Sequence, residues 1–165
     1  MAPALIVDLD NTLIDSEPLA ALRRARKWPA CRANAHMTSC FPDIQDVIAQ
    51  VRTSGIPVGV VTRSPSQYAA HLLNHHGIGY DELVAYHDVS RQKPHPESVE
   101  LCLARLDARA SSSLGVGDDP GDAQAYRAAD LLAWGAGWSP HLKDDGTWDL
   151  IAEDPRMILG HFGLN

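Results

Sequence analysis

Short apolar runs alternate along the chain with longer segments whose apolar residues recur at helical spacing. The runs predict strands over residues 5–8, 56–61, 83–86, 113–116 and 131–134. The periodic segments predict helices over about 16–28, 43–54, 66–76, 96–106 and 122–129, with a further helix near 157–159. Strands that alternate with helices indicate an α/β fold with a doubly wound parallel sheet and helices on both faces. We therefore expect one domain over residues 1–165.

The segment between the first two predicted helices is less regular. We expect Ser16 to cap the first helix, Pro29 to end it, and residues 30–41 to form a loop or an irregular insert, because they show no clear period. The tail after residue 140 also carries little signal, apart from the helix near 157–159.

Polar residues follow the predicted strands at the points where the strands end. Asp8 and Asp10 follow the first strand, and Thr62, Arg63 and Ser64 follow the second. The later strand ends add a lysine and further acids: Lys93, Asp118, Asp119 and Asp122. Because the carboxyl ends of parallel strands share one edge, these side chains should surround a single crevice.

This set of residues suits phosphoryl transfer. Neighbouring carboxylates repel each other unless a cation or a proton lies between them. Mg²⁺ prefers oxygen ligands and offsets the repulsion between an anionic nucleophile and an anionic substrate. Each residue also has an ordinary structural interpretation: Asn11, Thr62 and Asp122 suit turns or helix caps, and a single lysine usually lies on the surface.

Four segments resemble, in order, the signatures of the haloacid dehalogenase-like (HAD-like) hydrolase superfamily. They read DLDNTL at 8–13, VVTRS at 60–64, KPHPE at 93–97 and GVGDDPGD at 115–122. The resemblance implies the superfamily's Rossmannoid α/β fold and a Mg²⁺-dependent phosphatase that hydrolyses a phosphate monoester through an aspartyl-phosphate. The resemblance to the small magnesium-dependent phosphatase subgroup is weaker.

The resemblance also implies residue roles. Asp8 would be the nucleophile and a metal ligand, and Asp10 would be the general acid/base and offer its backbone carbonyl to the metal. Thr62 would bind a phosphoryl oxygen, Lys93 would hold Asp8 and the phosphoryl group, and Asp118 would complete the protein ligands of Mg²⁺.

Other positions near the signatures are less defined. Arg63 and Ser64 join Thr62 and Lys93 as expected substrate-binding residues. Asp122 would act on the metal through a water molecule or by contacting the direct metal ligands. Whether Asp118 or Asp119 contacts the metal stays open. Gln92 precedes the lysine where these proteins often have glycine.

The insert between the first two signatures, about residues 16–42, is too short for an independent core. We therefore expect no full cap domain and an open site, which could accept a small molecule or an exposed phosphate on a macromolecule, or be closed by a neighbouring subunit in an oligomer. The basic residues of this insert, Arg23, Arg24, Arg26 and Lys27, could attract phosphorylated substrates, although such a run is more often a solvated helix face.

Composition narrows the class of protein. The net charge of −7 argues against general nucleic-acid binding, and no apolar run approaches the length of a membrane span. The cysteines Cys31, Cys40 and Cys102 indicate reduced thiols in the cytoplasm rather than a disulfide framework. Cys31, His36 and Cys40 lack the ligand pairing of a zinc site.

Alternative functions remain for this arrangement of residues. A phosphoacceptor signalling module or a non-catalytic binding module could share the α/β fold, and another HAD phosphotransferase such as a mutase could share the site. Asp10 argues against a dehalogenase, and the short insert argues against a phosphonatase.

Overall fold

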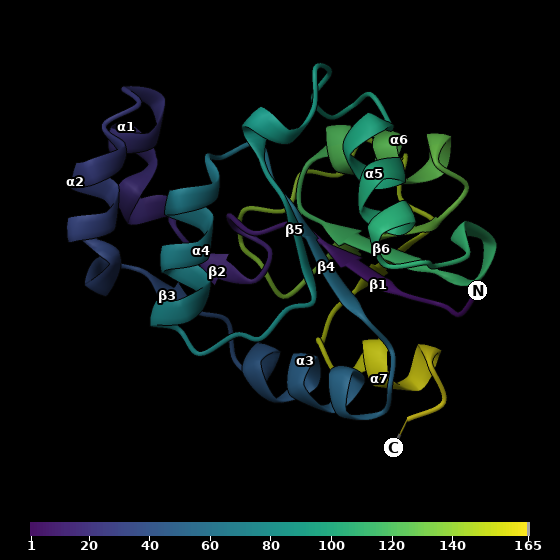
Figure 1. The fold of residues 1–165 in the computed structure, drawn as a ribbon. Coiled ribbons are helices and arrows are strands. Elements are labelled where there is room, and N and C mark those ends of the chain that lie inside the picture. Colours follow the sequence, from purple (N-terminus) through teal and green to yellow (C-terminus); the bar gives the residue numbers. More distant parts are fainter. Residues whose placement is uncertain (165) are drawn as a thin grey trace.

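A six-stranded parallel sheet with the order β5-β4-β1-β6-β7-β8 forms the centre of the computed structural model, which describes residues 1–164 (Figure 1). The strands are β1 (Leu5–Val7), β4 (Val58–Val61), β5 (Glu82–Val84), β6 (Leu114–Gly117), β7 (Leu132–Ala136) and β8 (Leu150–Ala152). The five strands predicted from the sequence are confirmed. The sequence did not indicate β8, because this edge strand has only three residues and buries just one of them.

The two faces of the sheet carry separate hydrophobic cores. In β1, Leu5 and Val7 point into one core and Ile6 into the other, and all three side chains are fully buried. The first core is covered by α3 (Ile44–Thr53), α4 (Ser66–His75) and α7 (Met157–His161). The second is covered by α5 (Glu97–Arg105) and α6 (Pro120–Ala128). Figure 1 shows α3 and α7 on the opposite side of the sheet from α5 and α6.

The strand order reverses beside β1. From β1 the chain passes to β4 on one side and β5 beyond it, then returns to β6 on the other side of β1. Ligands of open α/β sheets bind in the crevice outside the strand ends at such a reversal. Asp8 leaves β1 at this point, so the fold itself places the first signature in the crevice.

The insert differs from the prediction. It lies between a two-stranded antiparallel pair, β2 (Ile14–Asp15) and β3 (Ser39–Cys40), and contains two short helices, α1 (Ala20–Arg24) and α2 (Trp28–Ala33). The single predicted helix over 16–28 is wrong, because the chain reverses direction at Arg26, whose φ is +55°. The predicted loop over 30–41 contains most of α2 and all of β3.

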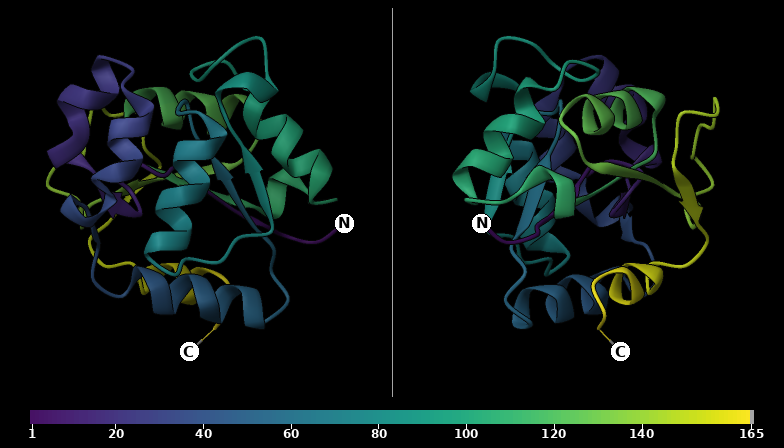
Figure 2. Two further views of the ribbon diagram at one scale, coloured as in Figure 1. Left: turned by 60° about the vertical axis from the view of Figure 1, so that its left-hand side comes forward. Right: turned by 90° about the vertical axis from the view of Figure 1, so that its right-hand side faces the viewer.

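Two predicted helix ends in the insert are also wrong. Pro29 lies in the first turn of α2, where the missing N–H of proline costs no hydrogen bond, so it begins a helix instead of ending one. Ser16 makes no capping hydrogen bond with its side chain. Figure 2 shows that α1 and α2 lie together beside α4, at the edge of the molecule.

The helices predicted outside the insert are confirmed. The helices predicted near 43–54, 66–76, 96–106, 122–129 and 157–159 are present, although α6 begins two residues earlier, at Pro120. Cys31, Cys40 and Cys102 are free thiols. Within residues 1–164 none of the helices has the length and apolar character needed to cross a membrane. The predicted single domain extends to residue 165, which lies outside the residues that the structure describes.

Close packing of α6 on β6 should make Gly115 intolerant of a side chain. A Cβ at this position would collide with the ring of Tyr126, which is fully buried and donates a hydrogen bond to the Val116 carbonyl. We expect Gly115→Ala to lower the free energy of unfolding by about 1–3 kcal/mol or more, measured by chemical denaturation. Gly160→Ala in α7 is the matched control, because a Cβ there meets no atom within 4 Å. Equal stability of the two variants would contradict this packing.

Candidate active site

The ammonium group of Lys93 is buried at the carboxyl edge of the sheet. Lys93 Nζ lies 2.7 Å from Asp122 Oδ1 and 3.1 Å from Asp8 Oδ1, and it donates to the Val61 carbonyl at 2.8 Å. These acceptors match the three donors of an ammonium group. Burial alone would lower the pKa of Lys93, but the charges of Asp122 and Asp8 outweigh burial and hold the pKa above its usual value. Lys93 is therefore a permanent cation inside the site.

Asp8 is the first carboxylate beside this cation. It follows β1 and is 9% exposed, and Thr12 Oγ1 donates to both Asp8 Oδ2 at 3.4 Å and Asp118 Oδ1 at 3.2 Å. Burial would raise the pKa of Asp8, but the charge of Lys93 and hydrogen bonds from its neighbours bring the pKa below its usual value. Asp8 is thus an ionised carboxylate at neutral pH.

Asp8, Asp118 and Asp122 form an acidic cluster in which one carboxylate oxygen from each residue lies within 4.8 Å of the others. Burial and the charge of Asp8 raise the pKa of Asp118 to about 10. If all three carboxylates were ionised, the cluster would carry more negative charge than Lys93 alone can balance. Oxygen donors with excess negative charge fit Mg²⁺, so the residues present suit the expected metal.

Asp122 and Asp119 have different structural roles. Asp122 is 2% exposed, and its Oδ2 accepts hydrogen bonds from the backbone N–H groups of Asp118 and Asp119, both at 3.2 Å. Asp119 caps α6 and accepts from the Gly121 N–H at 2.9 Å. Asp119 is therefore the N-cap residue. Asp122 is not the N-cap, but it completes the capping box of α6 by accepting from the Asp119 N–H. Its contacts with Lys93 and the loop hold Asp118 in the cluster.

Asp10 is held by three hydroxyl groups. Its Oδ1 accepts from Ser16 Oγ and Tyr68 OH, both at 2.7 Å, and its Oδ2 accepts from Ser64 Oγ at 2.9 Å. Arg23 Nε lies 3.8 Å from Oδ1. Ser16, predicted as a helix cap, instead orients this carboxylate.

Tyr68 is a site residue that the sequence indicated only as part of the core. It is fully buried on α4, and its ring lies 5.3 Å from that of Trp28 in the insert. A buried tyrosine hydroxyl needs a hydrogen-bond partner, and this requirement could have identified Tyr68 as a site residue. Tyr68 connects the sheet domain, Asp10 and the insert.

The loop after β4 supplies the remaining predicted residues. Thr62 is 3% exposed, and its Oγ1 accepts from the Ser64 N–H at 3.0 Å. The interpretation of Thr62 as a helix cap is wrong, because Pro65 occupies the N-cap position of α4. Arg63 is exposed beside these two residues.

A cavity of about 220 Å³ collects most of these side chains; its lining residues are Asp8, Asp10, Asn11, Arg23, Thr62, Arg63, Ser64, Asp118, Asp119 and Lys143. Lys93 does not line the cavity and acts on it through Asp8. Lys143 was missed by the sequence analysis, because it lies in the tail and belongs to none of the four motifs. Its Nζ lies 3.7 Å from Asp119 Oδ2, and its backbone N–H donates to the Asp118 carbonyl at 2.8 Å.

The raised pKa of Asp118 predicts a pH-dependent stability of the metal-free protein. Between its ordinary pKa of 3.8 and about 10, folded Asp118 keeps a proton that the unfolded chain releases, so the free energy of unfolding falls as pH rises. We expect a fall of up to about 1.4 kcal/mol per pH unit between pH ~7 and ~9, measured by denaturation in EDTA. Asp118→Asn should flatten this slope, and an unchanged slope in that variant would contradict the assignment.

Comparisons with known proteins place this geometry in a family. The sequence profile of haloacid dehalogenase-like hydrolases matches residues 20–135. Phosphoglycolate phosphatase of Yersinia pseudotuberculosis is 30% identical over 124 residues, which cover 74% of this chain and 52% of that protein. The enzyme of the same name from Escherichia coli is 33% identical over 133 residues, covering 77% and 52%. The chain spans about half the length of the curated relatives it matches.

Solved structures share the fold at lower identity. CbbY from Rhodobacter sphaeroides in complex with phosphate superposes with a TM-score of 0.82 at 20% identity, covering 99% of this chain and 100% of that one. A putative beta-phosphoglucomutase from Thermotoga maritima gives 0.79 at 19% identity, covering 98% of each chain. Since the family profile matches more than half of the chain, this protein belongs to the haloacid dehalogenase-like hydrolases.

Proposed function

We propose that this protein is a Mg²⁺-dependent phosphatase that hydrolyses a phosphate monoester through an aspartyl-phosphate on Asp8. The observation that carries the proposal is the meeting of Asp8, Asp10, Thr62 and Asp118 around one cavity, with Lys93 buried against Asp8. Family membership and the named phosphatase relatives support a phosphatase over a binding module with the same fold.

In the first step, Asp8 attacks the phosphorus atom. A new bond forms between a carboxylate oxygen of Asp8 and phosphorus, and the bond from phosphorus to the leaving oxygen breaks with its electron pair on that oxygen. Lys93 keeps Asp8 ionised and partly balances the charge of the reacting group. Thr62, whose hydroxyl faces the same cavity, would donate to a phosphoryl oxygen.

Asp10 would carry the proton in both steps. It protonates the leaving oxygen in the first step, and in the second it takes a proton from the water that attacks phosphorus, which frees inorganic phosphate and restores Asp8. Asp10 accepts hydrogen bonds from Ser16 and Tyr68 at Oδ1 and from Ser64 alone at Oδ2, so Oδ2 is the oxygen with room for the proton. These hydroxyls therefore control where Asp10 points.

Asp8 and Asp118 are the side chains that we expect to hold Mg²⁺, with the Asp10 backbone carbonyl as a further ligand. When bound, Mg²⁺ would offset the repulsion between the carboxylates and an anionic phosphoryl group. Asp122 is already engaged by Lys93 and two backbone N–H groups, so we assign it to holding the loop rather than to the metal.

Replacing the carboxylate of the proposed nucleophile by an amide of the same shape should abolish turnover. We expect Asp8→Asn to lower Mg²⁺-dependent phosphate release from a panel of small phosphate esters by roughly a thousandfold or more. Asp46→Asn, an exposed change on α3, is the control and should retain activity. Phosphate release that survives in Asp8→Asn would refute the proposed nucleophile. In the unaltered protein, a stable aspartyl-phosphate on Asp8 without release of phosphate would instead favour a phosphoacceptor module.

Asp10→Asn should separate proton transfer from metal binding. We expect kcat to fall by about 10²–10⁴-fold, because the leaving oxygen loses its proton donor. The affinity for Mg²⁺, measured by isothermal titration calorimetry, should change far less, since the proposed ligand of this residue is its backbone carbonyl. A parallel loss of kcat and Mg²⁺ affinity would contradict the assigned role.

A further inference from the structure

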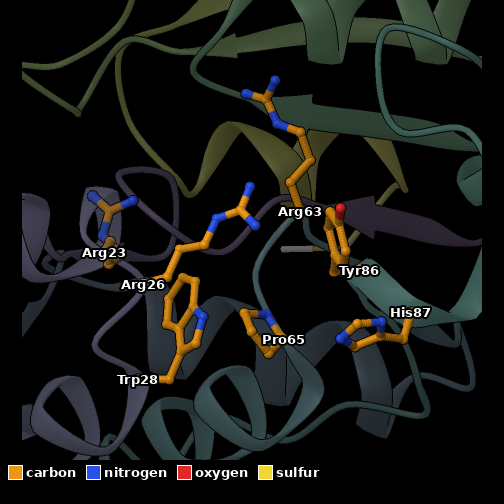
Figure 3. Close-up of a pocket in the computed structure, with 7 residues that line it drawn as sticks. All are labelled: Arg23, Arg26, Trp28, Arg63, Pro65, Tyr86 and His87. Carbon is orange, nitrogen blue, oxygen red and sulfur yellow. The ribbon is translucent and has the colours of Figure 1, made fainter.

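A second cavity adjoins the acidic site on the side of Asp10. It encloses about 180 Å³ and is lined by Arg23, Arg26, Trp28, Arg63, Pro65, Tyr86 and His87 (Figure 3). Arg23 and Arg63 line both cavities, so a bound molecule could extend from one into the other. We call this second space the basic cavity.

The basic cavity gathers positive charge that the described residues balance only in part. Within residues 1–164, neither Arg26 nor Arg63 has a carboxylate oxygen within 4.0 Å, and Arg23 reaches only Asp10, at 3.8 Å. The Arg23 Nε is buried and has no hydrogen-bond partner. In a chain with a net charge of −7, three guanidinium groups around one space indicate a site for an anion.

The walls of the basic cavity come from three parts of the fold. The insert supplies Arg26 and Trp28, the loop after β4 supplies Arg63, and the segment after β5 supplies Tyr86 and His87. Figure 3 shows the Arg26 side chain reaching from the insert toward the side that carries Arg63 and Tyr86. The predicted solvated face of the insert is therefore only partly right, because Arg24 and Lys27 are exposed and line neither cavity, whereas Arg23 and Arg26 face this space.

We propose that the basic cavity binds a second anionic group, a phosphate or a carboxylate, carried by the leaving group of the substrate. This proposal rests on the proposed phosphatase function. Asp10, the proposed proton donor to the leaving oxygen, lies against Arg23, so the leaving group extends from Asp10 into the basic cavity. Guanidinium groups bind phosphate and carboxylate through paired hydrogen bonds.

The test measures binding with ligands that the enzyme cannot hydrolyse. Alkylphosphonates of increasing chain length, each with a terminal methyl, carboxylate or second phosphonate, are titrated calorimetrically into the whole protein with Mg²⁺. We expect at least one chain length at which the second anion raises affinity by about tenfold or more over the methyl compound, as one charge-assisted hydrogen bond can supply. A gain in affinity with both anions indicates a general anion site, whereas a gain with only one anion identifies the group that the basic cavity binds.

Variants separate the basic cavity from general electrostatic attraction. Arg26→Ala should remove most of the gain from the second anion, whereas Arg24→Ala, an equal loss of charge on the neighbouring helix, should keep it. No gain at any chain length, or the same loss in both variants, would overturn the proposal. Because binding does not depend on turnover, these results stand apart from the activity of Asp8→Asn, which tests the proposed function separately.

Discussion

The buried ammonium of Lys93 is the constraint on which the site depends. Its three donors reach Asp8 after β1, the carbonyl of Val61 in β4, and Asp122 in α6, so it ties together segments far apart in the chain. Breaking a buried ion pair by removing one partner typically costs about 3–5 kcal/mol, because the other charge is left uncompensated. Removing any one of these partners would therefore leave a buried charge uncompensated where the strand ends meet.

This one cation gives the surrounding carboxylates different properties. Asp8 is held ionised beside Lys93, Asp122 is fixed by Lys93 and by backbone N–H groups, and the pKa of Asp118 rises because burial and the charge of Asp8 disfavour its ionised form. The cluster thus contains an ionised carboxylate and, next to it, a carboxylate whose ionised form needs a cation nearby. Under the proposed function, Mg²⁺ and the phosphoryl group would complete this electrostatic balance.

The sequence predicted the sheet and the residues at its edge because both depend on local patterns. Apolar runs that end in acids and hydroxyls report strand ends directly, and parallel topology brings those ends together. The insert was predicted less well, because the reversal at Arg26 requires a positive φ that arginine does not signal. Tyr68, Lys143 and the basic cavity depend on contacts between distant segments, which no local pattern records.

The insert supplies Arg26 and Trp28 to the wall of the basic cavity, so under the proposed function the reaction and the recognition of the leaving group would use different parts of the chain. In the proposed mechanism, Lys93 and its neighbours make Asp8 the nucleophile. Acid quenching during turnover, followed by mass spectrometry of the peptide containing residues 5–13, tests this directly. A phosphoryl group on Asp8 that appears and decays at the rate of turnover is the predicted result. Turnover without any modified Asp8, or with phosphorylation elsewhere, would contradict it.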